Sequence, residues 1–177
     1  MKRDQLEHII RSAGVISLSD NIIIIGSQAI LGEHPDAPRE LLMSMEADVI
    51  VPGNKDAWNL IDGVLGEESA FHETHGYYAD GVEEATAILP DNWKARLVKI
   101  DNPNTNGITG LCLEAHDLAS SKLYAGREKD ISFVTLMITH KLIYQTALLN
   151  RIGDTEIEQT LKKITLARAN RLFSENQ

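Results

Sequence analysis

Two acidic residues, Glu46 and Asp48, have the type and spacing needed to share a divalent cation. They open the segment Glu46-Ala47-Asp48-Val49-Ile50-Val51, whose β-branched residues favour a strand. Strand side chains alternate between faces, so the two carboxylates are expected on one face, about 7 Å apart. Oxygen ligands of this kind suit Mg²⁺ or Mn²⁺. The alternative is a solvated strand end, because acidic side chains are mostly exposed.

A glycine–serine pair lies shortly before these acids. The run Ile22-Ile23-Ile24-Ile25 predicts a strand that is buried on both faces. Gly26 then allows the backbone to turn tightly and to approach a ligand closely. Ser27 can cap a helix that starts near Gln28. This turn strengthens the interpretation of the downstream acids as ligands.

Two further charged residues, Lys122 and Asp130, fall on helix faces that are expected to be buried. Lys122 lies four residues after Leu118, and Asp130 begins an apolar stripe that continues at Phe133. Charged groups are rarely buried without a partner or a function. The structural alternatives are a snorkelling lysine and an ordinary helix N-cap. Together with the acid pair, the functional interpretation is favoured for both residues.

The glycine–serine turn with the acid pair, and the segment around Lys122 and Asp130, resemble motifs of a known protein superfamily. Gly26-Ser27 followed by Glu46-x-Asp48 is similar to the signature of the nucleotidyltransferase superfamily. The segment 117–130 resembles the Asp-Leu…Lys-Leu…Ala-x-Arg-x-Lys-Asp segment of its abortive-infection, toxin-type branch. Residues 89–97, which begin Leu-Pro-Asp-Asn-Trp, resemble the middle region of that branch. The resemblance spans about residues 20–140.

The resemblance implies a role for each residue of the first motif. Gly26 and Ser27 would cradle a nucleoside triphosphate, and Glu46 and Asp48 would hold Mg²⁺ or Mn²⁺ as catalytic metal ligands. The reaction would be attack by a hydroxyl group of RNA or protein on the α-phosphate, with pyrophosphate as the leaving group. The metal would neutralise phosphate charge and help to activate the hydroxyl.

The second motif would complete this catalytic site. Lys122 is implied to contact phosphate as a point charge, and thus to bind the nucleotide. Asp130 is implied to complete the acidic site or to orient Lys122. The superfamily's third acid commonly lies on a strand of its own, and Glu114, at the end of an expected strand, competes with Asp130 for that role.

The sequence departs from the toxin-type branch before the first acid. That branch usually has Arg-x-Thr there, whereas Leu42 and Ser44 occupy these positions. The first acid is Glu46, where aspartate is usual. A second hypothesis is therefore a catalytically inactive relative that acts by binding a partner protein, such as an antitoxin.

Length and composition suit one globular domain. The chain has 177 residues and a net charge of −9, so general binding to nucleic acid is disfavoured. Its single cysteine, Cys112, lies between two leucines, which predicts a core position and fits the reducing cytoplasm. No signal peptide or membrane-spanning run is recognised, and no membrane partner is expected.

We expect an α/β (α+β) fold with a nucleotidyltransferase-like mixed β-sheet flanked by helices. Residues 1–140 would form the core and residues 141–177 a C-terminal helical part packed on it, within a single domain. His72 and His75 share an expected helix face, where surface or packing roles are favoured over metal binding. The expected strands are 22–25, 46–51, 85–89, 96–100 and 108–113. The expected helices are 4–13, 27–32, 54–65, 117–125, 130–149 and 154–173, with a helical turn at 39–43.

Overall fold

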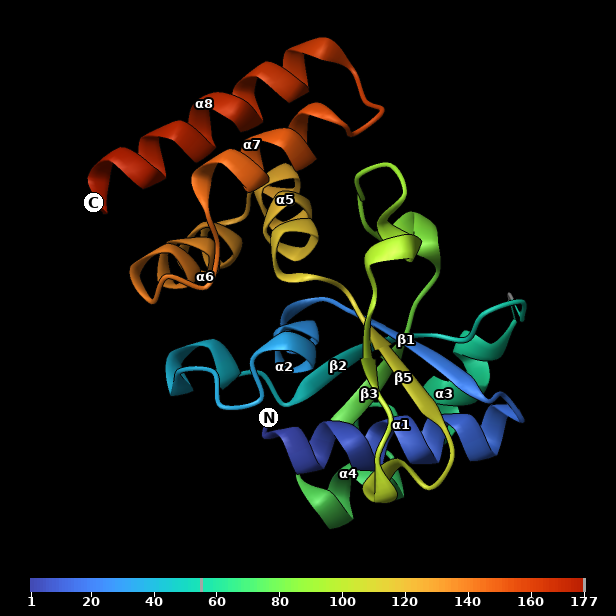
Figure 1. Cartoon of the computed structure of the whole chain (residues 1–177). Coiled ribbons are helices and arrows are strands. Elements are labelled where there is room, and N and C mark those ends of the chain that lie inside the picture. The colour runs from blue at the N-terminus through green and yellow to red at the C-terminus, as the bar shows by residue number, and fades with distance from the viewer. Residues whose placement is uncertain (55, 177) are drawn as a thin grey trace. The chain divides into compact units, whose positions relative to one another are not determined.

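The structure of the protein is a computed structural model that describes residues 1–54 and 56–176 (Figure 1). Its contacts divide the chain into two compact units. The sheet unit comprises Met1–Thr86 and Leu97–Leu113, and the helical unit comprises Ala87–Arg96 and the chain from Glu114 onward. A mixed sheet and flanking helices confirm the predicted α+β class.

The sheet unit is built on a five-stranded mixed sheet in the order β3-β2-β1-β5-β4. The β1 strand pairs with β2 in antiparallel and with β5 in parallel orientation, while β2–β3 is parallel and β4–β5 antiparallel. Because β1 is central, its isoleucines are buried on both faces, as the apolar run predicts. The strands are β1 (Asn21–Ile25), β2 (Glu46–Ile50), β3 (Tyr78–Gly81), β4 (Val98–Ile100) and β5 (Thr109–Cys112).

Helix α1 packs on this sheet and on α3. Its predicted apolar stripe is confirmed, because Leu6, Ile9, Ile10 and Ala13 are all fully buried. Gly110 leaves room for this helix, since a Cβ atom there would lie 2.4 Å from Cδ1 of Ile10. The helices of this unit are α1 (Arg3–Ser17), α2 (Ile30–Glu33), α3 (Ala57–Leu65) and α4 (Ala70–His75).

Two expected helices and one expected turn of the sheet unit also form. The helix expected at 27–32 consists of a 3₁₀ turn, η1 (Ser27–Ala29), followed directly by α2. The helical turn expected at 39–43 is the 3₁₀ turn η2 (Arg39–Leu42). The helix expected at 54–65 corresponds to α3, which is described from Ala57. The expected start of this helix includes Lys55, which lies outside the described residues.

The strand expected at 85–89 is wrong. Its first residues form a 3₁₀ turn, η3 (Glu84–Thr86), and the missing strand is β3, which lies earlier in the chain. The β-branched residues of 85–89 suggested a strand, but Pro90 follows them directly, and Pro has no N–H to continue a sheet ladder. A further 3₁₀ turn, η5 (Pro103–Thr105), occupies the predicted turn between β4 and β5.

The helical unit contains α5 (Ala115–Ala125), α6 (Glu128–Thr139), α7 (Gln145–Gly153) and α8 (Gln159–Glu175), and a 3₁₀ turn, η4 (Trp93–Arg96). The single helix expected at 130–149 is wrong, because Lys141 adopts a left-handed conformation with φ of 57° and ends α6. The last helix starts later than expected, with Glu158 rather than Asp154 as its N-cap. In the described part of the chain, no helix combines the length and apolarity needed to cross a bilayer.

Candidate active site

The turn after β1 brings backbone into close contact with one acidic side chain. Gly26 has φ of 65° and ψ of −167°, a combination that is open essentially to glycine alone. A Cβ atom at this position would lie 1.7 Å from Oδ2 of Asp48. The tight turn predicted at Gly26 is therefore present, with Asp48 packed against it, and the approach of this turn to a ligand stays a prediction.

Strand β2 supplies Glu46 and Asp48 from one of its faces. Ala47 and Val49 alternate with them and are buried, so the two acids keep partial access to solvent. The strand is aligned by β1, with Ile25 opposite Asp48. The predicted placement of both carboxylates on one face, beside the Gly26 turn, is confirmed.

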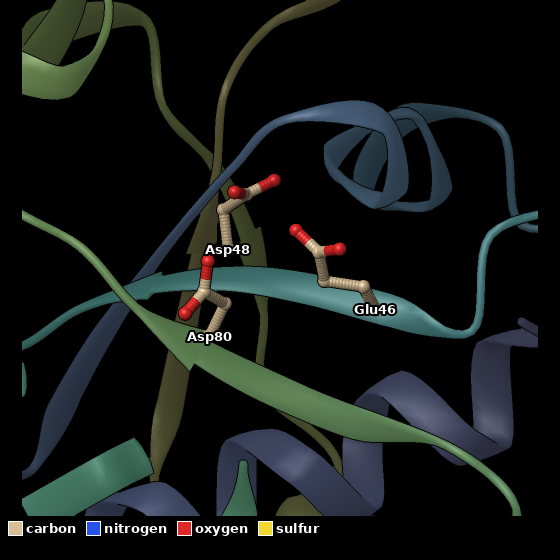
Figure 2. A group of neighbouring side chains, drawn as sticks. All are labelled: Glu46, Asp48 and Asp80. Carbon is tan, nitrogen blue, oxygen red and sulfur yellow. The ribbon is translucent and has the colours of Figure 1, made fainter. Parts of the chain in front are cut away.

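A third carboxylate, that of Asp80, completes the cluster from the neighbouring strand. Asp80 lies opposite Asp48 in the parallel pairing of β2 with β3. One oxygen atom from each of Glu46, Asp48 and Asp80 lies within 4.8 Å of the other two. Figure 2 shows the three side chains rising from the same side of these two strands.

Sequence reasoning missed Asp80 because it missed β3. The four residues Tyr-Ala-Asp-Gly lack the β-branched run that marks β1 and β2. The expectation that the third acid lies on its own strand was a usable signal. In the structure Asp80 lies on a strand of its own, whereas Glu114 is the N-cap of α5 and Asp130 lies in the first turn of α6.

Burial and neighbouring acids make it costly for Asp80 to carry its charge. Burial is the largest effect that raises the pKa of Asp80, and the charges of Asp62 and Glu46 raise it further. Asp62 also accepts a hydrogen bond from the backbone N–H of Gly81 at 2.6 Å. Acids that repel one another on adjacent strands are stabilised when a divalent cation neutralises them.

The donor set fits a hard metal ion. Three carboxylates within reach of one point are oxygen ligands of the kind that Mg²⁺ and Mn²⁺ prefer. No histidine or cysteine joins this group among the residues that the structure describes. Glu46 is further fixed through its backbone, because its N–H donates a 3.1 Å hydrogen bond to Oγ of Ser44.

Lys122 and Asp130 belong to the helical unit, where they contact each other. Nζ of Lys122 donates to Oδ1 of Asp130 at 3.3 Å and lies 4.6 Å from the centre of the Phe133 ring. Nε of Arg127 donates to the other oxygen of Asp130 at 2.6 Å. Both Lys122 and Asp130 are buried, as predicted, and each has a partner.

Glu114, the other candidate for the third acid, is engaged in capping α5. Its carboxylate accepts the N–H of Asp117 at 3.2 Å and contacts Nδ1 of His116 at 2.5 Å. Asp117 is in turn fully buried and paired with Arg96 at 2.8 Å and Arg151 at 3.0 Å. These contacts account for the acidic residues at the start of α5 without a metal.

The fold and the acid cluster thus define an α+β protein with a candidate divalent-cation site at a glycine–serine turn. The family described as "Nucleotidyltransferase of unknown function (DUF6036)" matches residues 4–170. The chain belongs to this family. The match confirms the resemblance at the level of the nucleotidyltransferases. Neither the curated proteins nor the solved structures gave a match.

Proposed function

We propose that this protein is a Mg²⁺-dependent nucleotidyltransferase that transfers a nucleoside monophosphate from a triphosphate to a hydroxyl group of RNA or protein. The observation that carries the proposal is the cluster of Glu46, Asp48 and Asp80 within 4.8 Å beside the Gly26 turn. Membership of a nucleotidyltransferase family supports it. A finer assignment, to a toxin–antitoxin or phage-defence component, follows from the resemblance of the segment 117–130.

The candidate site residues of the sheet unit each have a task in this proposal. Gly26 lets the backbone approach the triphosphate, and Ser27 offers polar groups at the start of η1. The three carboxylates hold the cation, which when bound neutralises phosphate charge and assists ionisation of the acceptor hydroxyl. The acceptor hydroxyl group would lose its proton to solvent and its oxygen would form a bond to the α-phosphorus. The bond between the α-phosphorus and the oxygen that bridges the α- and β-phosphates would break, and pyrophosphate would depart.

Lys122 enters the proposal with two possible tasks. As a point charge it is suited to contact phosphate. Its contacts with Asp130 and with the Phe133 ring support a structural task inside the helical unit instead. The two tasks predict different phenotypes, because a phosphate contact affects nucleotide affinity and a structural pair affects stability.

An inactive protein that binds a partner is the second candidate. The observation that favours it is Leu42 at the position where the toxin-type branch has arginine. Against it, Ser44 accepts a hydrogen bond from the N–H of Glu46, as the hydroxyl group of a threonine there would. The convergence of three acids also supports an active enzyme over an inactive relative.

The test is transfer of label from a nucleotide. The full chain is incubated with each α-³²P-labelled nucleoside triphosphate, Mg²⁺ and either total RNA or a cell extract. We expect label on an acceptor with the wild-type chain and none with Asp48→Asn, since this change removes an anionic ligand. The matched control is Asp36→Asn, which alters an exposed aspartate in the loop after α2.

Thermal stability provides a readout that needs no acceptor. Mg²⁺ with a triphosphate should raise the melting temperature of the wild-type chain, because a ligand of the native state stabilises it by mass action. The gain should vanish in Asp48→Asn and persist in Asp36→Asn. A wild-type chain that shows neither labelling nor a nucleotide-dependent shift would favour the partner-binding alternative.

A further inference from the structure

Tyr78 places a hydroxyl group against the first acid of the cluster. It lies directly opposite Glu46 in the pairing of β2 with β3. Its O–H donates to Oε2 of Glu46 at 3.3 Å, in a partly buried position. Tyr78 therefore links β3 to the side chain of Glu46, and β3 also carries Asp80 two residues later.

The length of Glu46 makes this contact useful. Aspartate is usual at this position in the resembling branch, and glutamate adds one methylene group and one torsion. A longer side chain loses more rotamer freedom when it is held in a single geometry. A hydrogen bond from a neighbouring strand restricts that freedom before a ligand arrives.

Tyr78 is itself held by α4. The ring of His72 lies 4.7 Å from the ring of Tyr78, centre to centre. Nδ1 of His72 accepts the N–H of Glu68 at 3.1 Å, and Ser69 caps the helix through the N–H of His72. The contact with Glu46 is thus backed by a second layer of interactions, as ligand-orienting residues in metal sites usually are.

We propose that Tyr78 is a positioning residue that holds the Glu46 carboxylate in the orientation needed to bind the divalent cation. The inference rests on the proposed function, because it assigns a task to Tyr78 only if Glu46 is a ligand. It goes further by explaining how this chain accommodates glutamate at a position where aspartate is usual.

The neighbouring Tyr77 offers a matched control. Its hydroxyl group also makes a side-chain hydrogen bond, with Nδ1 of His8 at 2.7 Å, and its side chain is buried. Tyr77 precedes β3, and its ring contacts those of His8, Phe71 and His75, whereas Tyr78 contacts Glu46 and His72. Tyr77→Phe therefore removes a similar hydroxyl group from the same segment without touching the acid cluster.

The test is a double-mutant cycle with Mn²⁺ alone as the probe, measured by isothermal titration calorimetry on the full chain. Tyr78→Phe should weaken Mn²⁺ binding roughly three- to tenfold, the range of one hydrogen bond. Tyr77→Phe should leave the affinity unchanged. In a Glu46→Asp background, Tyr78→Phe should cause no further loss, because the shorter carboxylate no longer depends on the hydroxyl.

The outcomes separate this inference from the proposed function. Affinity that is lost in Asp48→Asn but unchanged in Tyr78→Phe would refute the positioning role alone. An equal loss from Tyr78→Phe in the wild-type and Glu46→Asp backgrounds would also refute it, since it would show a general structural effect. A wild-type chain that does not bind Mn²⁺ would refute the proposed function, and this inference with it.

Discussion

Single residues decide whether the acid cluster can form, and Gly26 is the most constrained of them. Both its backbone conformation and the space at its Cα exclude a side chain, because Asp48 occupies the position of a Cβ atom. Gly26→Ala should lower stability by about 1–3 kcal/mol through backbone strain. It should also displace Asp48 and abolish Mn²⁺ binding.

Gly76→Ala separates the loss of stability caused by backbone strain from the loss of Mn²⁺ binding. Gly76 also has a positive φ, of 74°, but nothing lies within 4 Å of its Cβ position. We expect this control to lower stability, measured by urea unfolding, and to leave Mn²⁺ affinity at the wild-type value. Retention of Mn²⁺ binding by Gly26→Ala would show that the turn and Asp48 act independently.

A substitution of Lys122 distinguishes a role in phosphate binding from a structural ion pair. Its ion pair with Asp130 is buried, but Arg127 gives Asp130 a second positive partner. Lys122→Met keeps the apolar stem beside Phe133 and removes the charge. We expect a loss of about 1–3 kcal/mol in urea unfolding, the cost of a buried charged group that loses one partner. Triphosphate affinity should stay unchanged, whereas a stable variant with weakened nucleotide binding would assign Lys122 to phosphate.

The same ion pairs predict how stability depends on pH. Burial opposes ionisation of Asp130, but the hydrogen bond from Arg127 and the charges of Lys122 and Arg127 outweigh it and lower its pKa. A lowered folded-state pKa stabilises the fold above the unfolded pKa of about 3.9, and the contribution is lost as pH falls through the folded value. Urea unfolding between pH 7 and pH 3 should therefore show a smaller acid-induced loss for Asp130→Asn than for the wild-type chain.

The helices and strands of this protein differ in how well the sequence predicts them. The β1 and β2 strands were predictable because each has a run of β-branched residues and a clear end. Since Gly26 follows β1 and Glu46 and Asp48 lie on β2, these residues could be predicted together with the strands. The β3 strand was not, because its signal is only the alternation around Asp80. The sequence thus predicted the two strands that carry Gly26, Glu46 and Asp48, but not the short strand that carries Asp80.

The break between α6 and α7 illustrates a second limit. Helix ends are commonly marked by glycine, yet Lys141 takes the left-handed conformation here. The N–H of Leu142 donates to the carbonyl of Met137 across this break, and Ile143 beyond it is buried, so contacts that the residue type at position 141 does not reveal fix the end of α6. Likewise, Glu158 caps α8 through the N–H groups of Thr160 and Leu161, although glutamate is not a common N-cap.

Lys141→Gly tests this account of the break. Glycine adopts a positive φ without the steric cost that other residues bear, and Lys141 is exposed, so little packing is lost. The substitution should stabilise the chain by about 0.5 kcal/mol in urea unfolding, after the larger entropy of the unfolded chain is subtracted. Lys141→Ala should give no such gain, because alanine keeps the steric cost.

At the scale of the whole molecule, the two units differ in charge. The sheet unit holds 17 acidic and 6 basic residues, and the helical unit holds 9 acidic and 11 basic residues. The net charge of −9 therefore arises in the unit that carries the acid cluster. A triphosphate approaching that unit meets repulsion unless a divalent cation accompanies it, so nucleotide binding should require the metal.

Two compact units also predict how ligands act on unfolding. Differential scanning calorimetry should give a calorimetric enthalpy that exceeds the van't Hoff enthalpy, because units with separate cores need not unfold in one step. A Mg²⁺–triphosphate complex at about one hundred times its Kd should stabilise the binding unit by about 2.7 kcal/mol. If the ligands bind only the cluster of Glu46, Asp48 and Asp80, one transition should move upward and the other should stay, and Asp48→Asn should cancel the movement. If both transitions move upward in the wild-type chain and only one moves in Lys122→Met, Lys122 of the helical unit takes part in nucleotide binding.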